Sequence, residues 1–159
     1  MQATQKSSVT NESHGILTIA HTKNKYIRQA INLAISIRIH SPEIPIAIAT
    51  NLESKDFQKF GKLFDHIIQW DFSETPGLIA KLSIYEMTPF QETLFIDADC
   101  LVLKPLETIF EYLDDEEFSV FGINCNVNRE SGWFQNMEKI KNEINSETYP
   151  GFNGGIYYF

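Results

Sequence analysis

Short apolar runs alternate along the chain with segments whose apolar residues recur at helical spacing. The first run, at 16–20, is apolar enough for a strand that is buried on both faces. A polar stretch follows it. From 25 to 40 the apolar residues then recur every three or four positions, which predicts an amphipathic helix. The same order returns further along the chain, so the sequence predicts repeated strand–helix units.

The repeated pattern predicts the remaining elements and the fold class. Further strands are expected at 46–49, 66–70, 94–96, 118–123 and 155–159. Helices are expected after Ser54 (burying Phe57, Phe60 and Phe64), after Thr75 and Pro76 (burying Leu78, Leu82 and Tyr85 or Met87), after Pro105, and over 133–144. This alternation implies an α/β fold with a mainly parallel, Rossmann-like sheet and helices on both faces. Because ligands of such sheets bind at the carboxyl ends of the strands, we expect chemistry after Ala20, Ile96 and Ile123.

The two ends of the chain depart from this pattern. Residues 1–14 are rich in Ser, Thr, Asn and Gln and predict a flexible tail before a domain over 15–159. At the other end the sequence stops inside the apolar run 156–159, whereas domain ends are usually polar. We therefore expect the sheet to be incomplete and the chain to be part of a longer domain.

Composition and charge exclude several classes of protein. Hydrophobic residues make up 43% and charged residues 21%, which is typical of a folded globular chain. The net charge of −8 argues against a nucleic-acid partner. No run approaches the roughly 20 apolar residues of a membrane helix and no apolar leader is visible, so we expect a cytoplasmic protein without a membrane segment. Cys100 and Cys125 are expected to be reduced thiols, and the four histidines lack zinc-site spacing.

The strongest chemical signal is an apolar strand that leads directly into two carboxylates, Asp97 and Asp99. In an extended conformation residues i and i+2 point to the same side, so both carboxylates would face one point at the edge of the sheet. Two like charges held close together favour a shared cation, and oxygen ligands suit Mn²⁺ or Mg²⁺. From these residues alone, a solvated loop after a strand remains the alternative.

The surrounding residues resemble glycosyltransferase family 8, the glycogenin-like enzymes of the GT-A fold. The resemblance rests on Lys81-Leu82 before the strand, on the DADCLVL run at 97–103 and on the FNGG run at 152–155, where the family has Ser in place of the first Gly. The first strand, its loop and Tyr26 also look like the family's first strand–helix unit. The resemblance extends over 16–159.

The resemblance implies transfer of a sugar from a nucleotide-diphosphate sugar, in the first place a UDP-sugar, to an unidentified acceptor that is a glycan, a lipid or a protein. It implies that Asp97 and Asp99 bind Mn²⁺ or Mg²⁺, which bridges the diphosphate. No catalytic nucleophile is evident, and His21 is interpreted as a surface residue. The residues that the resemblance places at the donor are Ile19, Thr22, Tyr26, Lys81, Asp97, Ala98, Asp99, Asn153, Gly154 and Gly155.

Two alternatives to an active transferase remain open. The family takes a third metal ligand, a histidine, from a region downstream of the FNGG-like run, and none of the four histidines here can be assigned to it. The chain could therefore be a nucleotide-binding remnant without activity. The other alternative is a haloacid-dehalogenase-like phosphatase with Asp97 as nucleophile. That motif has Thr or Val where this chain has Leu101, and it follows the first strand rather than the fourth.

Overall fold

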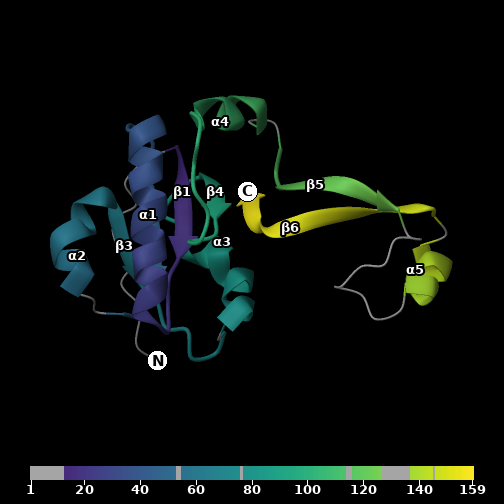
Figure 1. Ribbon diagram of the computed structural model, residues 1–159, viewed down its shortest axis with the longest axis horizontal. Coiled ribbons are helices and arrows are strands. Elements are labelled where there is room, and N and C mark those ends of the chain that lie inside the picture. Colours follow the sequence, from purple (N-terminus) through teal and green to yellow (C-terminus); the bar gives the residue numbers. More distant parts are fainter. Residues whose placement is uncertain (1–12, 53–54, 76, 114–115, 127–136, 145) are drawn as a thin grey trace. The chain divides into compact units, whose positions relative to one another are not determined.

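The computed structural model describes residues 13–52, 55–75, 77–113, 116–126, 137–144 and 146–159 (Figure 1). The chain folds into two compact units. One consists of the residues up to Ser119 together with Gly155–Phe159, and the other consists of Val120–Gly154. The predicted tail lies almost entirely outside the described residues. His14 already belongs to the first strand, and the Ser13 carbonyl accepts a hydrogen bond from the Glu92 N–H at 2.9 Å.

The first unit contains most of the strands and helices. Its strands are β1 (His14–Ile19), β2 (Ile46–Thr50), β3 (His66–Gln69), β4 (Glu92–Ile96) and the end of β6 (Thr148–Tyr158). Its helices are α1 (Asn24–His40), α2 (Lys55–Phe60), α3 (Ile84–Met87) and α4 (Glu107–Leu113), with 3₁₀ turns η1 (Gly61–Leu63) and η2 (Gly77–Ser83). The strands predicted from apolar runs are confirmed at nearly the expected positions, except that β6 begins at Thr148 and not at Gly155.

The sheet has the strand order β3-β2-β1-β4-β6-β5. β1 pairs in parallel with β2 and with β4, and β2 pairs in parallel with β3. β6 pairs antiparallel with β4, with Tyr157 opposite Phe95. The predicted Rossmann-like α/β fold with a mainly parallel sheet is therefore confirmed, and β6 is its antiparallel member.

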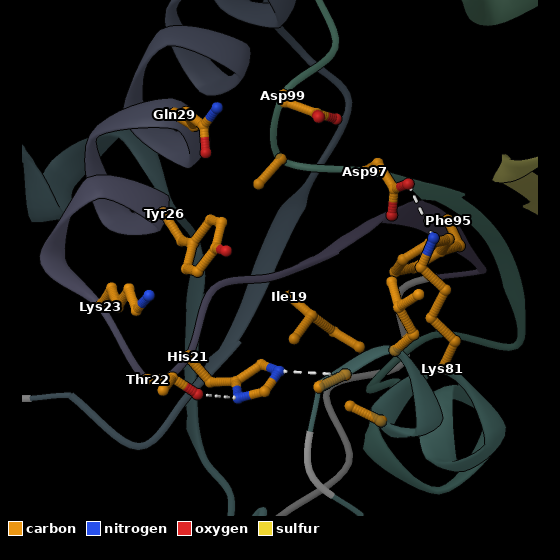
Figure 2. Close-up of a pocket in the computed structure, with 14 residues that line it drawn as sticks. Ile19, His21, Thr22, Lys23, Tyr26, Gln29, Lys81, Phe95, Asp97 and Asp99 are labelled. Carbon is orange, nitrogen blue, oxygen red and sulfur yellow. Dashed lines mark hydrogen bonds and ion pairs between the residues drawn. The ribbon is translucent and has the colours of Figure 1, made fainter.

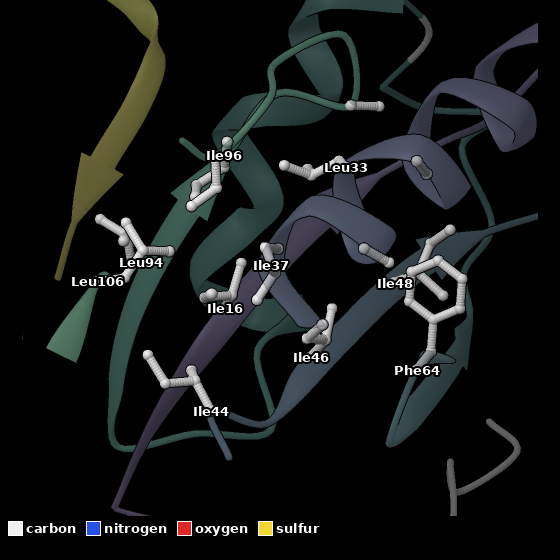
Figure 3. Close-up of a cluster of buried hydrophobic side chains, with 14 of the residues drawn as sticks. Ile16, Leu33, Ile37, Ile44, Ile46, Ile48, Phe64, Leu94, Ile96 and Leu106 are labelled. Atoms are coloured by element: carbon white, nitrogen blue, oxygen red, sulfur yellow. The ribbon is translucent and has the colours of Figure 1, made fainter. Parts of the chain in front are cut away.

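Alternating side chains of the strands enter two separate cores. Figure 3 shows the first core, in which Ile16, Ile48 and Leu94 pack with the apolar side of α1, including Leu33 and Ile37. Successive strand residues point to opposite faces, and the neighbouring positions enter the second core. That core gathers Leu17, Ala47 and Phe95 with residues of η2 and α3. Burial on both faces explains why these strands are continuously apolar in the sequence.

The predicted helix after Thr75 is wrong in most of its buried face. Leu78, Leu82 and either Tyr85 or Met87 were expected inside. Met87 is buried, but the exposed fractions of Leu78, Leu82 and Tyr85 are 82%, 82% and 76%. The buried positions are Ala80, Ile84 and Met87, which have equally good helical spacing. The first part of the segment is also a 3₁₀ helix rather than an α-helix, and it starts at Gly77 with φ of +66°. Pro76 lies outside the described residues.

The segment from 97 to 106, between β4 and α4, contains neither helix nor strand. Two serines of the α1 region bind its backbone. The Val102 N–H donates to Ser36 Oγ at 2.9 Å, and the Leu106 N–H donates to Ser41 Oγ at 2.8 Å. Ser41 Oγ in turn donates to the Glu107 carboxylate at 2.9 Å. These bonds fix the segment that follows the two carboxylates.

The second unit contains most of β5 (Ser119–Asn126), α5 (Met137–Ile144) and the first part of β6. A Cβ at Gly122 would lie 2.5 Å from the Gly151 carbonyl oxygen, so the two strands approach closely there. The predicted strand at 118–123 and part of the predicted helix at 133–144 are thus found, while 127–136 lie outside the described residues. Of the helices described in either unit, none combines the length and the apolar character that a bilayer crossing requires.

The role of Ser41 can be tested by its replacement with Ala. Ser41 is 0% exposed, so Ser41→Ala would leave the Leu106 N–H without its acceptor inside the protein. We expect the free energy of unfolding to fall by roughly 1–3 kcal/mol in urea denaturation. Ser83→Ala is the matched control, because Ser83 precedes α3 without a capping side-chain hydrogen bond. Equal losses in the two variants would contradict the role assigned to Ser41.

Candidate functional site

A cavity of about 450 Å³ lies in the first unit, where β1 and β4 end (Figure 2). Three segments line it. These are the end of β1 with the start of α1 (Ile19, His21, Thr22, Lys23, Tyr26, Gln29), η2 (Gly77, Leu78, Ala80, Lys81), and the end of β4 with the following turn (Phe95, Asp97, Ala98, Asp99). The cavity therefore lies at the carboxyl ends of two parallel strands, where ligands of such sheets usually bind. A loop directly after Ile123 was also expected to bind ligand, but β5 continues there to Asn126, in the second unit, and 127–136 lie outside the described residues.

The two carboxylates border this cavity, but not through an extended backbone. The Cys100 N–H donates to the Asp97 carbonyl at 3.0 Å, so a turn follows β4 directly. The Asp97 N–H donates to the Gly155 carbonyl at 2.8 Å and thereby joins the start of this turn to β6. The expectation of an extended Asp97–Asp99 segment is wrong, because the hydrogen bond from the Cys100 N–H to the Asp97 carbonyl closes a turn over Ala98 and Asp99. Asp97 is half-buried and Asp99 is exposed.

A lysine from another element neutralises one of these carboxylates. Lys81 Nζ lies 2.7 Å from Asp97 Oδ2, and the side chains are 22% and 29% exposed (Figure 2). The same ammonium lies 5.7 Å from the centre of the Phe95 ring. η2 thus brings a cation to the carboxylate edge of the cavity.

The loop between β1 and α1 contains a strained residue. Thr22 has φ of 72°, a left-handed conformation that costs a β-branched residue on the order of 1–3 kcal/mol. Its N–H donates to Asn51 Oδ1 at 3.3 Å, and its hydroxyl lies 2.7 Å from His21 Nδ1. These contacts stabilise a backbone conformation that brings the loop to the cavity. Strain of this kind is common at binding sites.

His21 has a larger structural role than the sequence indicated. Its ring stacks on Phe72, with centroids 4.3 Å apart and an interplanar angle of 11°. Its Nε2 lies 3.3 Å from the Gly77 carbonyl, so it joins the first loop to η2 across one side of the cavity (Figure 2). The available sequence signal was its position directly after a buried strand.

Gln29 is a cavity residue that the sequence analysis missed. It lies three positions after Tyr26 on α1, so the two side chains share one face of the helix. Its Oε1 is buried and has no hydrogen-bond partner among the described residues. Such an atom is costly to bury. The spacing from Tyr26 was the signal that could have identified it.

The expected donor residues separate into two groups. Those that line the cavity are Ile19, Thr22, Tyr26, Lys81, Asp97, Ala98 and Asp99. Gly155 is buried and contributes its carbonyl to Asp97. Asn153, which is exposed, and Gly154 lie in the part of β6 that belongs to the second unit.

The carboxylates at the cavity suit a cation that is shared with a ligand. Within the described part of the chain, no three His, Cys, Asp or Glu side chains gather into a metal-binding group. Asp97 and Asp99 provide two carboxylates at one cavity. Mg²⁺ is commonly bound by one or two carboxylates together with substrate phosphates and water. The residues present therefore fit a divalent ion that is held jointly with a diphosphate.

Burial and the neighbouring carboxylates both affect the pKa of the Cys100 thiol. Cys100 and Cys125 are both free thiols. Burial raises the pKa of Cys100 above its usual value, the charges of Asp99 and Asp97 raise it further, and Lys81 acts in the opposite direction. The thiol therefore stays protonated at neutral pH, which makes it a poor nucleophile.

No model of a protein family matches the sequence. A curated relative is a protein of Arabidopsis thaliana that carries the name UDP-glucuronate:xylan alpha-glucuronosyltransferase 3. It is 25% identical over 128 residues, which is 69% of this chain and 19% of the relative. The chain thus matches about a fifth of the length of that protein.

Solved glycosyltransferases share the fold. The galactosyltransferase LgtC, solved with donor and acceptor sugar analogs, has a TM-score of 0.63 at 20% identity over 91% of this chain and 57% of its own. GlyE of Streptococcus pneumoniae has a TM-score of 0.58 at 18% identity over 94% and 34%. Mouse xyloside xylosyltransferase 1 has a TM-score of 0.58 at 12% identity over 92% and 67%.

These neighbours show that the chain has the GT-A fold of glycosyltransferases. They do not favour the phosphatase alternative. Membership of glycosyltransferase family 8 in particular stays a prediction.

The negative charge of Asp99 is expected to lower the reactivity of the Cys100 thiol. Asp99→Asn removes a charge that raises the pKa of this thiol, so more thiolate should form at a given pH above 7. We expect iodoacetamide to alkylate Cys100 faster in this variant at pH 8, measured on the Cys100 peptide by mass spectrometry. Asp71→Asn, at an exposed position elsewhere, is the control. An unchanged rate in Asp99→Asn would show that the carboxylate does not act on the thiol.

Proposed function

We propose that this chain is the donor-binding part of a glycosyltransferase that transfers a sugar from a nucleotide-diphosphate sugar in a metal-dependent reaction. The observation that carries the proposal is the cavity at the ends of β1 and β4, with two carboxylates and a lysine at one side. Its volume of about 450 Å³ falls within the usual range of about 300–1,000 Å³ for small-molecule sites. The GT-A fold of the chain supports the same reaction class.

The nucleoside lies against the first loop in this proposal. Ile19 offers an apolar side chain, and Thr22 and Tyr26 offer hydroxyl groups at the start of α1. Ala98, which lies between Asp97 and Asp99 in the sequence, is buried and lines the cavity with a small side chain. It therefore leaves room for the nucleotide. UDP is the first nucleotide to test, since the name of the Arabidopsis relative refers to a UDP-sugar.

The diphosphate lies at the carboxylate side of the cavity in this proposal. Asp97 and Asp99 hold Mn²⁺ or Mg²⁺ together with the phosphates, and Lys81 adds a further positive charge. When bound, the divalent ion supplies Lewis-acid stabilisation of the departing diphosphate. Lys81 stabilises the same negative charge by electrostatics, which is effective because its side chain is only 22% exposed.

The sugar and the acceptor lie beyond the nucleotide. Gly155, in the first unit, is proposed to lie near the donor sugar, because a glycine allows close approach of a backbone to a ligand. For Asn153 and Gly154, in the second unit, a role at the sugar stays a prediction from the resemblance. The acceptor is a glycan, a lipid or a protein, and residues outside the cavity would recognise it. Sugar transfer breaks the bond to the diphosphate while positive charge develops on the sugar, by analogy with glycoside hydrolysis.

Calorimetric titration of UDP with and without Mn²⁺ tests the proposal. We expect Mn²⁺ to strengthen UDP binding by at least roughly ten-fold, about 1.4 kcal/mol. The double variant Asp97→Asn/Asp99→Asn should lose that gain, since it removes both proposed ligands. Glu111→Gln/Glu116→Gln is the matched control, because it removes two exposed carboxylates that do not line the cavity.

The outcomes separate the alternatives. Failure of the folded wild-type chain to bind UDP with Mn²⁺ would contradict the donor site. UDP binding that does not depend on metal would contradict the role of the carboxylates. Metal-dependent binding without turnover of any UDP-sugar, measured as release of UDP, would favour the nucleotide-binding remnant over an active transferase.

A further inference from the structure

The ion pair between Lys81 and Asp97 has a consequence for how ligands enter the proposed donor site. Lys81 Nζ lies 2.7 Å from Asp97 Oδ2, so the ammonium already contacts one of the carboxylates to which the proposed function assigns a divalent ion. Both side chains are mostly shielded from water, with 22% and 29% exposure. Their interaction is therefore screened less than that of a surface ion pair.

The charges around the cavity make the ammonium and a divalent ion competitors. Among the described residues, the charged side chains of the lining are Asp97, Asp99, Lys81 and Lys23. Figure 2 shows Lys23 on the opposite side of the cavity from Asp97. A divalent ion at Asp97 and Asp99 would lie close to the Lys81 ammonium, and the repulsion between two cations weakens the binding of both.

A diphosphate reverses this relation. Asp97, Asp99 and Lys81 together carry a charge of about −1, and a divalent ion brings the total to about +1. The diphosphate of a nucleotide sugar carries about two negative charges, which both cations can share. The four-carbon stem of a lysine lets its ammonium move from a carboxylate to a nearby phosphate without movement of the backbone.

We propose that Lys81 is an exchangeable counter-ion, which pairs with Asp97 until the diphosphate and metal arrive together and then moves to the diphosphate. Lys81 thereby opposes binding of the metal alone and favours binding of the metal with nucleotide. Thermodynamic linkage requires that the nucleotide strengthens metal binding by the same factor by which the metal strengthens nucleotide binding. This positioning role rests on the proposed function and specifies how the binding of its two ligands is coupled.

Titration of Mn²⁺ alone, followed by electron paramagnetic resonance of the free ion, tests the exchange. Lys81→Met should raise the affinity for Mn²⁺ by about ten-fold, because the competing ammonium is gone. The same variant should bind UDP in saturating Mn²⁺ about ten-fold more weakly, because it lacks the phosphate partner. A purely structural role for Lys81 would not change the two affinities in opposite directions.

Two further variants serve as controls. Lys23→Met deletes the same charge from the same cavity, and we expect its Mn²⁺ affinity to stay within about two-fold of wild type because the screened distance is longer. Lys81→Arg keeps a cation and should keep the weak Mn²⁺ affinity of the wild type. Thermal melting of each variant verifies that it is folded, and Lys81→Gln replaces Lys81→Met if the latter does not fold.

The results separate this inference from the proposed function. Weaker UDP binding by Lys81→Met without tighter Mn²⁺ binding would overturn the exchange, while a metal-dependent donor site would stand. An equal gain in Mn²⁺ affinity for Lys23→Met and Lys81→Met would also overturn it, since the ion pair would then have no special effect. If the wild type binds no UDP with Mn²⁺, the proposed function fails and the exchange fails with it.

Discussion

The hydrogen bonds that fix residues 97–106 are the constraint on which the cavity depends. This segment carries both carboxylates, but it has no helix or strand to fix its backbone. The Asp97 N–H is bound by the Gly155 carbonyl, and the N–H groups of Val102 and Leu106 are bound by serine hydroxyls of the α1 region. A buried N–H without a partner costs roughly 1–3 kcal/mol, so each of these bonds selects one path for the chain. β6 and α1 therefore determine where the carboxylates lie.

The lining of the cavity combines several unfavourable local features. Thr22 adopts a left-handed backbone, Gln29 has a buried oxygen without a partner, and Lys81 is partly buried beside Asp97. Each feature reduces stability unless neighbouring groups compensate for it. Their concentration around one cavity, while the strands have regular two-sided cores, is typical of a site that is shaped for a ligand.

The sequence predicted the sheet well because burial on both faces leaves a direct signal. Strands such as β2 read as unbroken apolar runs, and the carboxylates were correctly expected directly after β4. In the buried face of η2 and α3, Met87 was one of two alternatives. The rest could not be predicted, because Ala80 and Ile84 have the same spacing as the exposed positions Leu78 and Leu82. The turn at Asp97 depends on one local hydrogen bond with Cys100, and the contact of His21 with Phe72 joins residues distant in sequence. Neither leaves a periodic signal.

A metal–nucleotide complex is proposed to bind in the cavity at the carboxyl ends of β1 and β4. Paramagnetic broadening of backbone amide signals by Mn²⁺ with UDP, compared with diamagnetic Mg²⁺ with UDP, tests it most directly. The account predicts strong broadening at His21, Tyr26 and Ala98, which line the cavity, and little at Ile67 on the edge strand β3. Equal broadening at Ile67 and Ala98, or broadening confined to residues outside the cavity, would contradict the account.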